Sequence, residues 1–229
     1  MAKHKFVTSW SGGKDSCHAM RLARAQGHRL VALLSMLEPA GEHSRSHGLD
    51  ASLLRAQAER LNVPLLRSSP SWSDYESAFV EQLIRARDEF DADAAVFGDI
   101  DVQTHRDWVE RVCARPDVAL KPLFPLWEVN RRRLVEDMIA SGLKAKIVSC
   151  NERLGEGFLG RVLDARTLVD LEAAGVDACG ENGEYHSFVF DCREFSGPIT
   201  AREGKRYQKH VPRKTRPSDE YWYLELELA

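Results

Sequence analysis

Close to the N-terminus the chain reads Lys5-Phe6-Val7-Thr8-Ser9-Trp10-Ser11-Gly12-Gly13-Lys14-Asp15-Ser16. Residues 5–8 lean towards apolar and β-branched types, as in a buried strand, and apolar residues at helical spacing follow the loop as far as Gly27. Two adjacent glycines let the backbone between strand and helix approach a ligand closely. The N–H groups and the dipole of the first helical turn then attract an anion. With two serine hydroxyls and the charge of Lys14, this unit is predicted to bind phosphate.

The spacing of the loop narrows the kind of phosphate site. Gly12 and Gly13 are adjacent, so neither the Walker A pattern nor the dinucleotide pattern G-x-G-x-x-G is present. The motif S-G-G-K-D-S at 11–16, after an N-terminal strand, resembles the PP-loop of the ATP pyrophosphatase superfamily. This resemblance implies that ATP places its β,γ-pyrophosphate on the loop while a substrate oxygen attacks the α-phosphorus. A tight Gly-Gly turn without a ligand is the alternative.

Composition indicates an ordinary globular protein. The 229 residues suffice for one large domain or for one domain with an appendage, and a net charge of −3 argues against a protein that coats nucleic acid. No apolar run approaches the roughly 20 residues of a membrane span, and no signal-peptide core begins the chain. The five cysteines are scattered without a C-x-x-C pair, so we expect reduced thiols in a cytoplasmic protein.

Strand and helix patterns alternate through the first half of the chain. An apolar run predicts a strand at 29–37, and a helix at 73–90 is expected to start with a Ser73/Glu76 capping box. This repetition predicts an α/β fold in which helices cover both faces of a parallel sheet. The tail has no long helix; strands are expected there at 188–190, 197–201, 207–211 and 221–228.

Ligands of parallel α/β sheets bind at the carboxyl ends of the strands. We therefore expect nucleotide contacts from residues at these ends, namely Ser35, Met36, Gly98 and Asp99. The backbone around Met36 is expected to contact adenine, and a plain core role for Met36 is the alternative. The polar loop 38–48 is either solvated surface or a flap that brings His47 to ATP. On the helix that starts near residue 104, His105 and Arg106 are candidate substrate-binding residues.

A second glycine-rich stretch reads Gly180-Glu181-Asn182-Gly183-Glu184-Tyr185-His186-Ser187. Its glycines and asparagine permit tight turns, which gather two carboxylates, an aromatic ring and an imidazole. Two carboxylates with a tyrosine suit a cationic group, and they could equally steer ammonium or position a proton acceptor. An acidic turn without a ligand is the alternative. The residues expected to bind substrate here are Glu181, Asn182, Gly183, Glu184, Tyr185 and His186.

Several motifs occur in one order along the chain: S-G-G-K-D-S at 11–16, G-D-I at 98–100, Leu126-Trp127 after a proline, F-L-G-R at 158–161 and G-E-N-G-E-Y-H-S at 180–187. Together they resemble the diphthine–ammonia ligase family of PP-loop ATPases over most of the chain. The G-E-x-G-E block is the most specific of them. The resemblance implies a HUP-like, PP-loop ATP-binding domain at 1–125 and a smaller α+β substrate-binding domain at 126–229, which brings the Glu181/Glu184 loop over the phosphate loop.

The family resemblance also implies a reaction, the ATP-dependent amidation of diphthine on elongation factor 2 by ammonia. The diphthine carboxylate attacks the α-phosphorus, pyrophosphate leaves, and ammonia then displaces AMP, while Mg²⁺ offsets charge on the phosphates. Lys14, Asp15, Glu181 and Glu184 are the implied catalytic residues, and Asp15 is the implied Mg²⁺ ligand or orients the loop. Glu181 and Glu184 would face the substrate, where the trimethylammonium group of diphthine suits the cation-binding interpretation. The implied nucleotide contacts of the loop are Ser9, Trp10, Ser11, Gly12, Gly13, Lys14, Asp15 and Ser16.

Other functions remain open at this stage. Ser9-Trp10 and Tyr185-His186 resemble bacterial members of the family, and in bacteria, which lack diphthamide, the acceptor would be another carboxylate. A second PP-loop class modifies tRNA, and a third reading is an ATP-binding protein without turnover or with a different small substrate. The source of ammonia and the oligomeric state, including a homodimer, are left open by the sequence.

Overall fold

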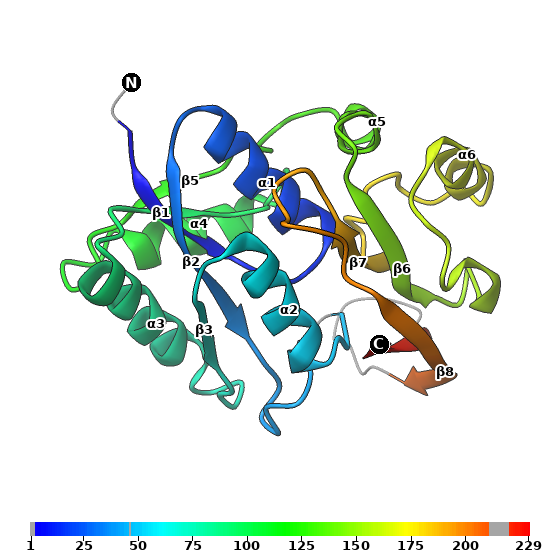
Figure 1. Ribbon diagram of the computed structural model, residues 1–229, viewed down its shortest axis with the longest axis horizontal. Coiled ribbons are helices and arrows are strands. Elements are labelled where there is room, and N and C mark those ends of the chain that lie inside the picture. Colours follow the sequence, from blue (N-terminus) through cyan, green and yellow to red (C-terminus); the bar gives the residue numbers. More distant parts are fainter. Residues whose placement is uncertain (1–2, 46, 211–219) are drawn as a thin grey trace.

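The computed structural model describes residues 3–45, 47–210 and 220–229. A parallel sheet from the first half of the chain lies on one side of the molecule, and an antiparallel sheet from the second half lies on the other (Figure 1). Two helices, α1 (Lys14–Ala25) and α2 (Ala51–Leu61), pack between the sheets. The expected α/β fold with a smaller α+β part is confirmed.

The parallel sheet of the described chain has five strands in the order β3-β2-β1-β4-β5. All of its neighbouring strands pair in parallel. The crossovers contain α1, α2, α3 (Tyr75–Phe90) and α4 (Gln103–Cys113). The strands are β1 (Lys5–Ser9), β2 (Arg29–Met36), β3 (Leu65–Ser68), β4 (Ala94–Val96) and β5 (Lys121–Leu123).

Alternation along the central strand explains why helices cover both faces of this sheet. Phe6 of β1 belongs to a buried cluster that also contains Met20 of α1 and Leu54 of α2. The next residue, Val7, belongs to a second buried cluster with Phe79 of α3 and residues of α4. Successive side chains of a strand point to opposite faces, so each face of β1 is covered by its own pair of helices.

The order of the strands reverses at β1. The chain moves outward from β1 through β2 to β3, and it then returns to place β4 on the other side of β1. The carboxyl ends of β1, β2 and β4 therefore meet at the point where an open α/β sheet forms its ligand crevice. Residues 10–13 leave β1 at this point, so the topology places the glycine loop at the ligand-binding edge.

The second half of the chain forms, within the described residues, a four-stranded antiparallel sheet in the order β7-β6-β9-β8. Asn130 and Asp164 cap the two helices of this part by accepting hydrogen bonds from backbone N–H groups. None of the described helices combines the length and apolar composition needed to cross a membrane. The elements are α5 (Arg131–Ala140), β6 (Lys144–Asn151), η1 (Glu156–Phe158), α6 (Ala165–Ala173), β7 (Tyr185–Asp191), β8 (Ala201–His210) and β9 (Glu220–Leu228).

The expected Ser73/Glu76 capping box is wrong. The helix α3 begins at Tyr75, and the Glu76 carboxylate accepts hydrogen bonds from Trp108 and Arg111 of α4. Glu76, which the sequence pattern assigned to the cap, therefore binds Arg111 on the neighbouring helix instead. Charge-assisted hydrogen bonds to a guanidinium are stronger than a neutral capping bond, which explains the outcome.

The expected strand at 197–201 is also wrong, because β8 begins at Ala201. The strand expected at 207–211 forms the end of β8 as far as His210, and residue 211 lies outside the described residues. One buried cluster contains both Phe6 of β1 and Leu226 of β9. The two sheets therefore share a core, and the domain boundary between residues 125 and 126 stays a prediction.

Candidate active site

The loop between β1 and α1 requires glycine at two positions. Gly12 has a φ of +83°, and a Cβ there would lie 2.7 Å from Cδ2 of Leu54. A Cβ on Gly13 would lie 2.4 Å from Cε1 of His47. Gly13 is also the N-cap of α1 and has no side chain that could accept from the first turn. The N-cap residue thus leaves the first-turn N–H groups uncapped, as at helix starts that bind anions, and phosphate binding by this loop stays a prediction.

Two serines hold this loop in shape. The Ser11 hydroxyl accepts from the N–H of Gly13 at 3.2 Å and lies 3.1 Å from the Ser16 hydroxyl. The Ser16 hydroxyl donates in turn to the carbonyl of Gly13 at 3.2 Å. These local bonds link the end of β1 to the first turn of α1, so the loop is ordered by its own side chains.

Lys14 and Asp15 form an ion pair at the base of α1. The Lys14 ammonium lies 2.7 Å from Oδ2 of Asp15 and 5.1 Å from the centroid of the Tyr185 ring. Burial opposes the charge of Lys14, but Asp15 and Tyr185 outweigh burial, and the pKa of Lys14 is raised. Lys14 therefore stays charged at neutral pH. The other Asp15 oxygen, Oδ1, is buried and has no hydrogen-bond partner in the described structure.

Strand β7 of the second sheet runs along the glycine loop. The N–H of Val189 donates to the carbonyl of Gly12 at 2.9 Å, and the Ser187 hydroxyl accepts from the N–H of Lys14 at 3.2 Å. The Gln57 side chain of α2 donates to the carbonyls of Gly12 and Val189. Sequence reasoning missed this clamp. The available signal was a glutamine at a buried position of an otherwise apolar helix face.

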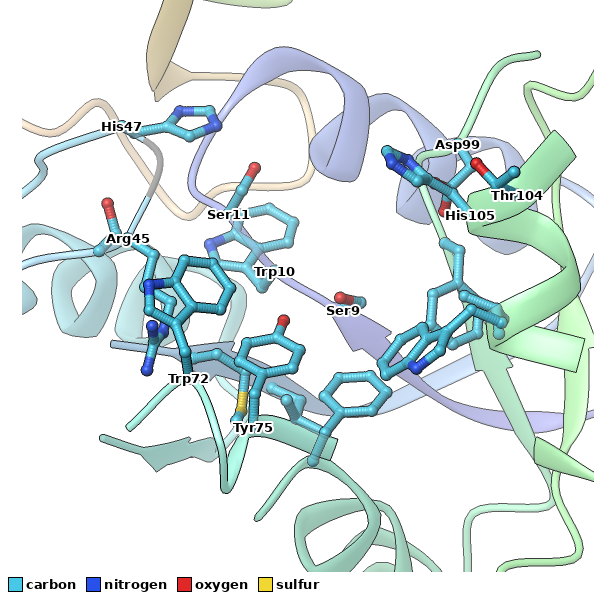
Figure 2. A pocket seen from close by; sticks show the side chains of 17 residues that line it. Ser9, Trp10, Ser11, Arg45, His47, Trp72, Tyr75, Asp99, Thr104 and His105 are labelled. Atoms are coloured by element: carbon cyan, nitrogen blue, oxygen red, sulfur yellow. The ribbon is translucent and has the colours of Figure 1, made fainter. Parts of the chain in front are cut away.

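A cavity of about 710 Å³ opens beside the loop at the carboxyl edge of the parallel sheet. Figure 2 shows Trp72, Tyr75 and Arg45 on one side of it and Thr104 and His105 on the other, with the end of β1 between them. The predicted nucleotide contacts that line this cavity are Ser9, Trp10, Ser11, Met36, His47 and Asp99.

Two further predicted nucleotide contacts, Ser35 and Gly98, pack against the backbone at the two ends of the loop. The Ser35 hydroxyl donates to the carbonyl of Trp10 at 2.7 Å. A Cβ on Gly98 would lie 2.9 Å from the carbonyl carbon of Asp15 and from the nitrogen of Ser16. Gly98 thus lets the end of β4 approach the first turn of α1. Nucleotide contact by Ser35 and Gly98 stays a prediction.

An aromatic wall of the large cavity was not found from the sequence. Trp72 and Tyr75 precede or begin α3, and Trp108 lies on α4. The Arg45 guanidinium lies 4.5 Å from the Trp72 ring centroid and 5.4 Å from that of Tyr75. Trp72 remains 77% exposed, so it forms a rim of the cavity. These residues come from separate elements, and no local motif connects them in the sequence.

A smaller cavity of about 300 Å³ lies between the glycine loop and the Glu181/Glu184 loop. Lys14 and Asp15 line it from α1, and Glu181 lines it from the opposing loop. His47 and His105 line both this small cavity and the large one. The structure therefore brings the two glycine-rich stretches together around one small cavity, which shares two lining residues with the large one.

The pKa values of the two shared histidines are shifted in opposite directions. His47 donates from Nδ1 to the carbonyl of Ser187 at 2.9 Å, and burial lowers its pKa to about 4. It is therefore neutral at physiological pH, with Nε2 left as an acceptor. His105 lies 3.5 Å from Oδ1 of Asp99, and this carboxylate raises the pKa of His105. The His186 ring lies 4.6 Å from that of His47.

Glu181 and Glu184 have different surroundings. Burial first, and the nearby Asp15 second, raise the pKa of Glu181 to about 7. Glu184 is buried, and its carboxylate accepts hydrogen bonds from the N–H of Asp177 and from the N–H and side-chain amide of Asn182. These bonds favour a role for Glu184 in shaping the loop. Its contact with substrate stays a prediction.

Two further candidates are already engaged. The Tyr185 hydroxyl donates to the carbonyl of Ala178, and its ring face is occupied by the Lys14 ammonium. Arg106 pairs with Glu110 and lies 4.6 Å from the ring centroid of Trp127. Arg106 lines neither of the two cavities that share His47. Substrate contact by Tyr185 and by Arg106 stays a prediction.

Fold and site together define an α/β nucleotide-binding protein of the PP-loop type. Comparison with known families places residues 4–121 in the diphthamide synthase N-terminal domain and residues 130–213 in the diphthamide synthase C-terminal domain. The chain therefore belongs to the diphthamide synthase family, whose curated relatives are named diphthine–ammonia ligases.

The extent of the similarity is shown by three of these relatives, all from vertebrates. The diphthine–ammonia ligase of Bos taurus is 31% identical over 245 residues, covering 95% of this chain and 90% of the relative. That of Danio rerio is 32% identical, and the match covers 82% of this chain and 83% of the relative. That of Homo sapiens is also 32% identical and covers 82% and 79%. The similarity therefore extends over both sheets and not only over the phosphate loop.

Proposed function

We propose that this chain is an ATP-dependent, AMP-forming amide ligase that adenylates the carboxylate of diphthine on elongation factor 2 and amidates it with ammonia. One observation carries the proposal: the large cavity and the small cavity are adjacent beside the glycine loop, with His47 and His105 lining both. A phosphoanhydride and a second substrate can thus reach one point. The names of the relatives supply the acceptor and the amine.

ATP would occupy the large cavity with its terminal phosphates on the glycine loop. The base and ribose would lie between the end of β2, at Met36, and the aromatic wall of Trp72 and Tyr75. The pyrophosphate would bind the loop backbone at Gly12 and Gly13 together with the hydroxyls of the two serines. The α-phosphate would then face the second cavity, where an attacking oxygen can approach it in line.

Lys14 would stabilise the charge that develops on the leaving pyrophosphate. Its ammonium is buried and keeps its proton because of Asp15. A fixed charge in a water-poor site stabilises developing negative charge more than the same charge does in water. The ion pair also keeps Lys14 in place before ATP binds, so little reorganisation accompanies the reaction.

The residues present fit Mg²⁺ bound together with the phosphates. Oδ1 of Asp15 is a buried carboxylate oxygen without a partner in the described structure, and the Asp15 residue lines the small cavity. The described residues contain no group of three or more metal-ligating side chains. Mg²⁺ is commonly held by one or two carboxylates plus substrate phosphates, so Asp15 would supply the protein ligand. The ion would neutralise charge on the phosphates.

The acceptor would approach the α-phosphate from the side of the small cavity, because ATP would fill the large one. In an organism without diphthamide, another carboxylate would take its place in the same reaction. The described cysteines are all free and buried, which fits the reducing cytoplasm that we propose as its location.

Thiolation of tRNA is less well supported. It requires a reactive thiol, and Cys179 is the cysteine that borders the small cavity. Its thiol donates to the carbonyl of Arg131, and burial raises its pKa to about 12. A thiol with this pKa stays protonated and is a poor nucleophile at neutral pH.

The test is to mix the purified chain with ATP, Mg²⁺, ammonium and elongation factor 2 that carries diphthine. We expect AMP and pyrophosphate in equal amounts, and an amide on the acceptor. The same factor without diphthine is the matched control and should give neither product. Formation of ADP and phosphate would contradict the proposal. Binding of tRNA that weakens steeply with salt would support the tRNA alternative instead.

A further inference from the structure

Three carboxylates lie in or around the small cavity, and they differ in what they bind. Asp15 pairs with Lys14 through Oδ2, and Glu184 accepts three hydrogen bonds within its own loop. The Glu181 backbone N–H donates to Asp177, but among the described residues the Glu181 carboxylate has no hydrogen-bond or ion-pair partner. Glu181 is thus the lining carboxylate that remains available to a ligand.

The cationic side chains near Glu181 are paired with other carboxylates, so the Glu181 carboxylate can still bind a cationic ligand. The charged groups that act on it include Lys14 and Asp15 of α1, Arg131 of α5 and Asp101 after β4. His105 of α4 lines the same cavity, and Glu181 contributes to its raised pKa, after the closer Asp99. Arg131 already pairs with Asp101 and with Asp177. Lys14 is already paired with Asp15. Because the pKa of Glu181 is raised, its carboxylate can accept a proton near neutral pH.

The lining of the small cavity suits a small cation that carries N–H groups. An ammonium ion has four hydrogens to donate, and the cavity offers the free carboxylate of Glu181 and the unprotonated Nε2 of His47. A quaternary ammonium has no N–H and prefers aromatic faces. The Tyr185 ring is 1% exposed and already faces Lys14. The cavity therefore matches ammonium better than the trimethylammonium group of diphthine.

We propose that Glu181 binds ammonium in this cavity and takes the proton that ammonium must lose before it can attack the acyl-adenylate. This inference rests on the proposed function. In the step, one N–H bond of ammonium breaks and the proton passes to the Glu181 carboxylate. The freed lone pair forms a C–N bond to the acyl carbon, the C–O bond to AMP breaks, and AMP leaves with that electron pair. The second proton passes from the new amide nitrogen to solvent.

The experiment compares Glu181→Gln with the parent protein and with Glu152→Gln, a matched change at an exposed glutamate. Glutamine keeps the shape of Glu181 but cannot take a proton. Three reactions are measured with elongation factor 2 carrying diphthine: acceptor-dependent exchange of pyrophosphate into ATP, amide formation from ammonium, and hydroxamate formation from hydroxylamine. Hydroxylamine is mostly unprotonated in neutral buffer, so it needs no base before it attacks.

We expect Glu181→Gln to lose about 10²–10⁴-fold in kcat/KM for ammonium, the usual contribution of a general base. Exchange and hydroxamate formation should stay close to those of the parent, which also shows that the variant is folded. Glu181→Asp should retain part of the ammonium reaction because a carboxylate remains.

Two results would overturn the inference. Parent-like use of ammonium by Glu181→Gln would show that another group takes the proton. Equal loss of exchange, hydroxamate and amide formation would show that Glu181 acts before ammonium enters. A parent protein that gives no exchange with the diphthine acceptor would instead refute the proposed function, and the two failures are thereby distinguished.

Discussion

The side-chain Nε2 of Gln57, on α2, lies 3.0 Å from the carbonyl oxygen of Gly12 in the phosphate loop. The same nitrogen lies 2.7 Å from the carbonyl oxygen of Val189 on β7, and Oε1 accepts from the Trp10 indole at 2.7 Å. A single buried side chain thus connects the loop, a helix of the first sheet and a strand of the second. Contacts from the second sheet therefore add to the bonds that the loop makes within itself.

Replacing Gln57 with leucine should weaken both folding and ATP binding. The carbonyl of Val189 and the indole N–H of Trp10 would lose their side-chain partner in a buried place, which costs about 1–3 kcal/mol for each unsatisfied group. Chemical denaturation and calorimetric titration with a non-hydrolysable ATP analogue measure the two effects. Gln26→Leu, at an exposed position, is the control. Unchanged ATP affinity in Gln57→Leu would show that the clamp does not shape the nucleotide site.

Gly98→Ala should displace the first turn of α1. The new Cβ would lie 2.9 Å from the backbone of Asp15 and Ser16, and backbone cannot yield as a flexible side chain does. Overpacking of this kind costs about 1–3 kcal/mol, so we expect ATP affinity to fall about ten-fold. Gly157→Ala is the matched control, because a Cβ there meets nothing within 4 Å. Equal affinities in the two variants would contradict the prediction.

Asp15→Ala should abolish turnover, and Asp15→Asn should reduce it strongly while the protein stays folded. Both changes remove the charge that pairs with Lys14. Alanine also removes the buried oxygen that we assign to Mg²⁺, whereas asparagine keeps a neutral amide oxygen, which is a weaker ligand. The measurement is AMP release as a function of Mg²⁺ concentration, with the exposed Asp88→Asn as control. If Asp15→Asn shows the Mg²⁺ dependence of the parent, Asp15 is not the metal ligand.

Glu184→Ala should spare ATP binding but impair the acceptor step. The carboxylate organises its loop by accepting from Asp177 and Asn182, and the loop borders the small cavity, not the large one. Calorimetric titration should give an ATP-analogue affinity within about two-fold of the parent, well under the 1.4 kcal/mol of a ten-fold change. Amide formation should fall strongly. Turnover equal to that of the parent would remove this loop from the reaction.

His18 should make the protein less stable as the pH falls from about 6.5 to about 4. Its side chain is 4% exposed, and burial, followed by the charge of Arg21, lowers its pKa to about 4. The unfolded chain takes up a proton on His18 near the ordinary pKa of 6.5, whereas the folded chain does not, so unfolding is favoured within this window. Protonation of His18 in the unfolded chain therefore lowers the free energy of unfolding by ~3 kcal/mol across this window.

Denaturation curves on both sides of that window provide the measurement. His18→Gln should lose less stability than the parent between the two pH values, and His43→Gln, at a partly exposed histidine, should behave like the parent. Equal losses in His18→Gln and the parent would assign the pH dependence to other groups.

Much of the fold could be predicted because its signals are local. The strand at 5–8, the glycine loop and the amphipathic helix after it follow each other directly, and each requires only neighbouring residues. The order of strands and helices then led to the parallel sheet. The capping box at Ser73 failed for the opposite reason. Glu76 pairs with Arg111, which is thirty-five residues away in the sequence, so no local pattern could indicate the contact.

The sequence by itself determined the α/β class of the protein and its phosphate loop, because Gly12, Gly13 and Lys14 act through backbone conformation and charge that adjacent residues define. Only the tertiary structure decided which side chains share the site. Packing of β7 against α1 and α2 brought Gln57 and Ser187 to the loop and engaged the Glu184 carboxylate. It left the Glu181 carboxylate without a hydrogen-bond or ion-pair partner among the described residues. Such differences arise from burial and from contacts distant in the chain, which one-dimensional spacing does not contain.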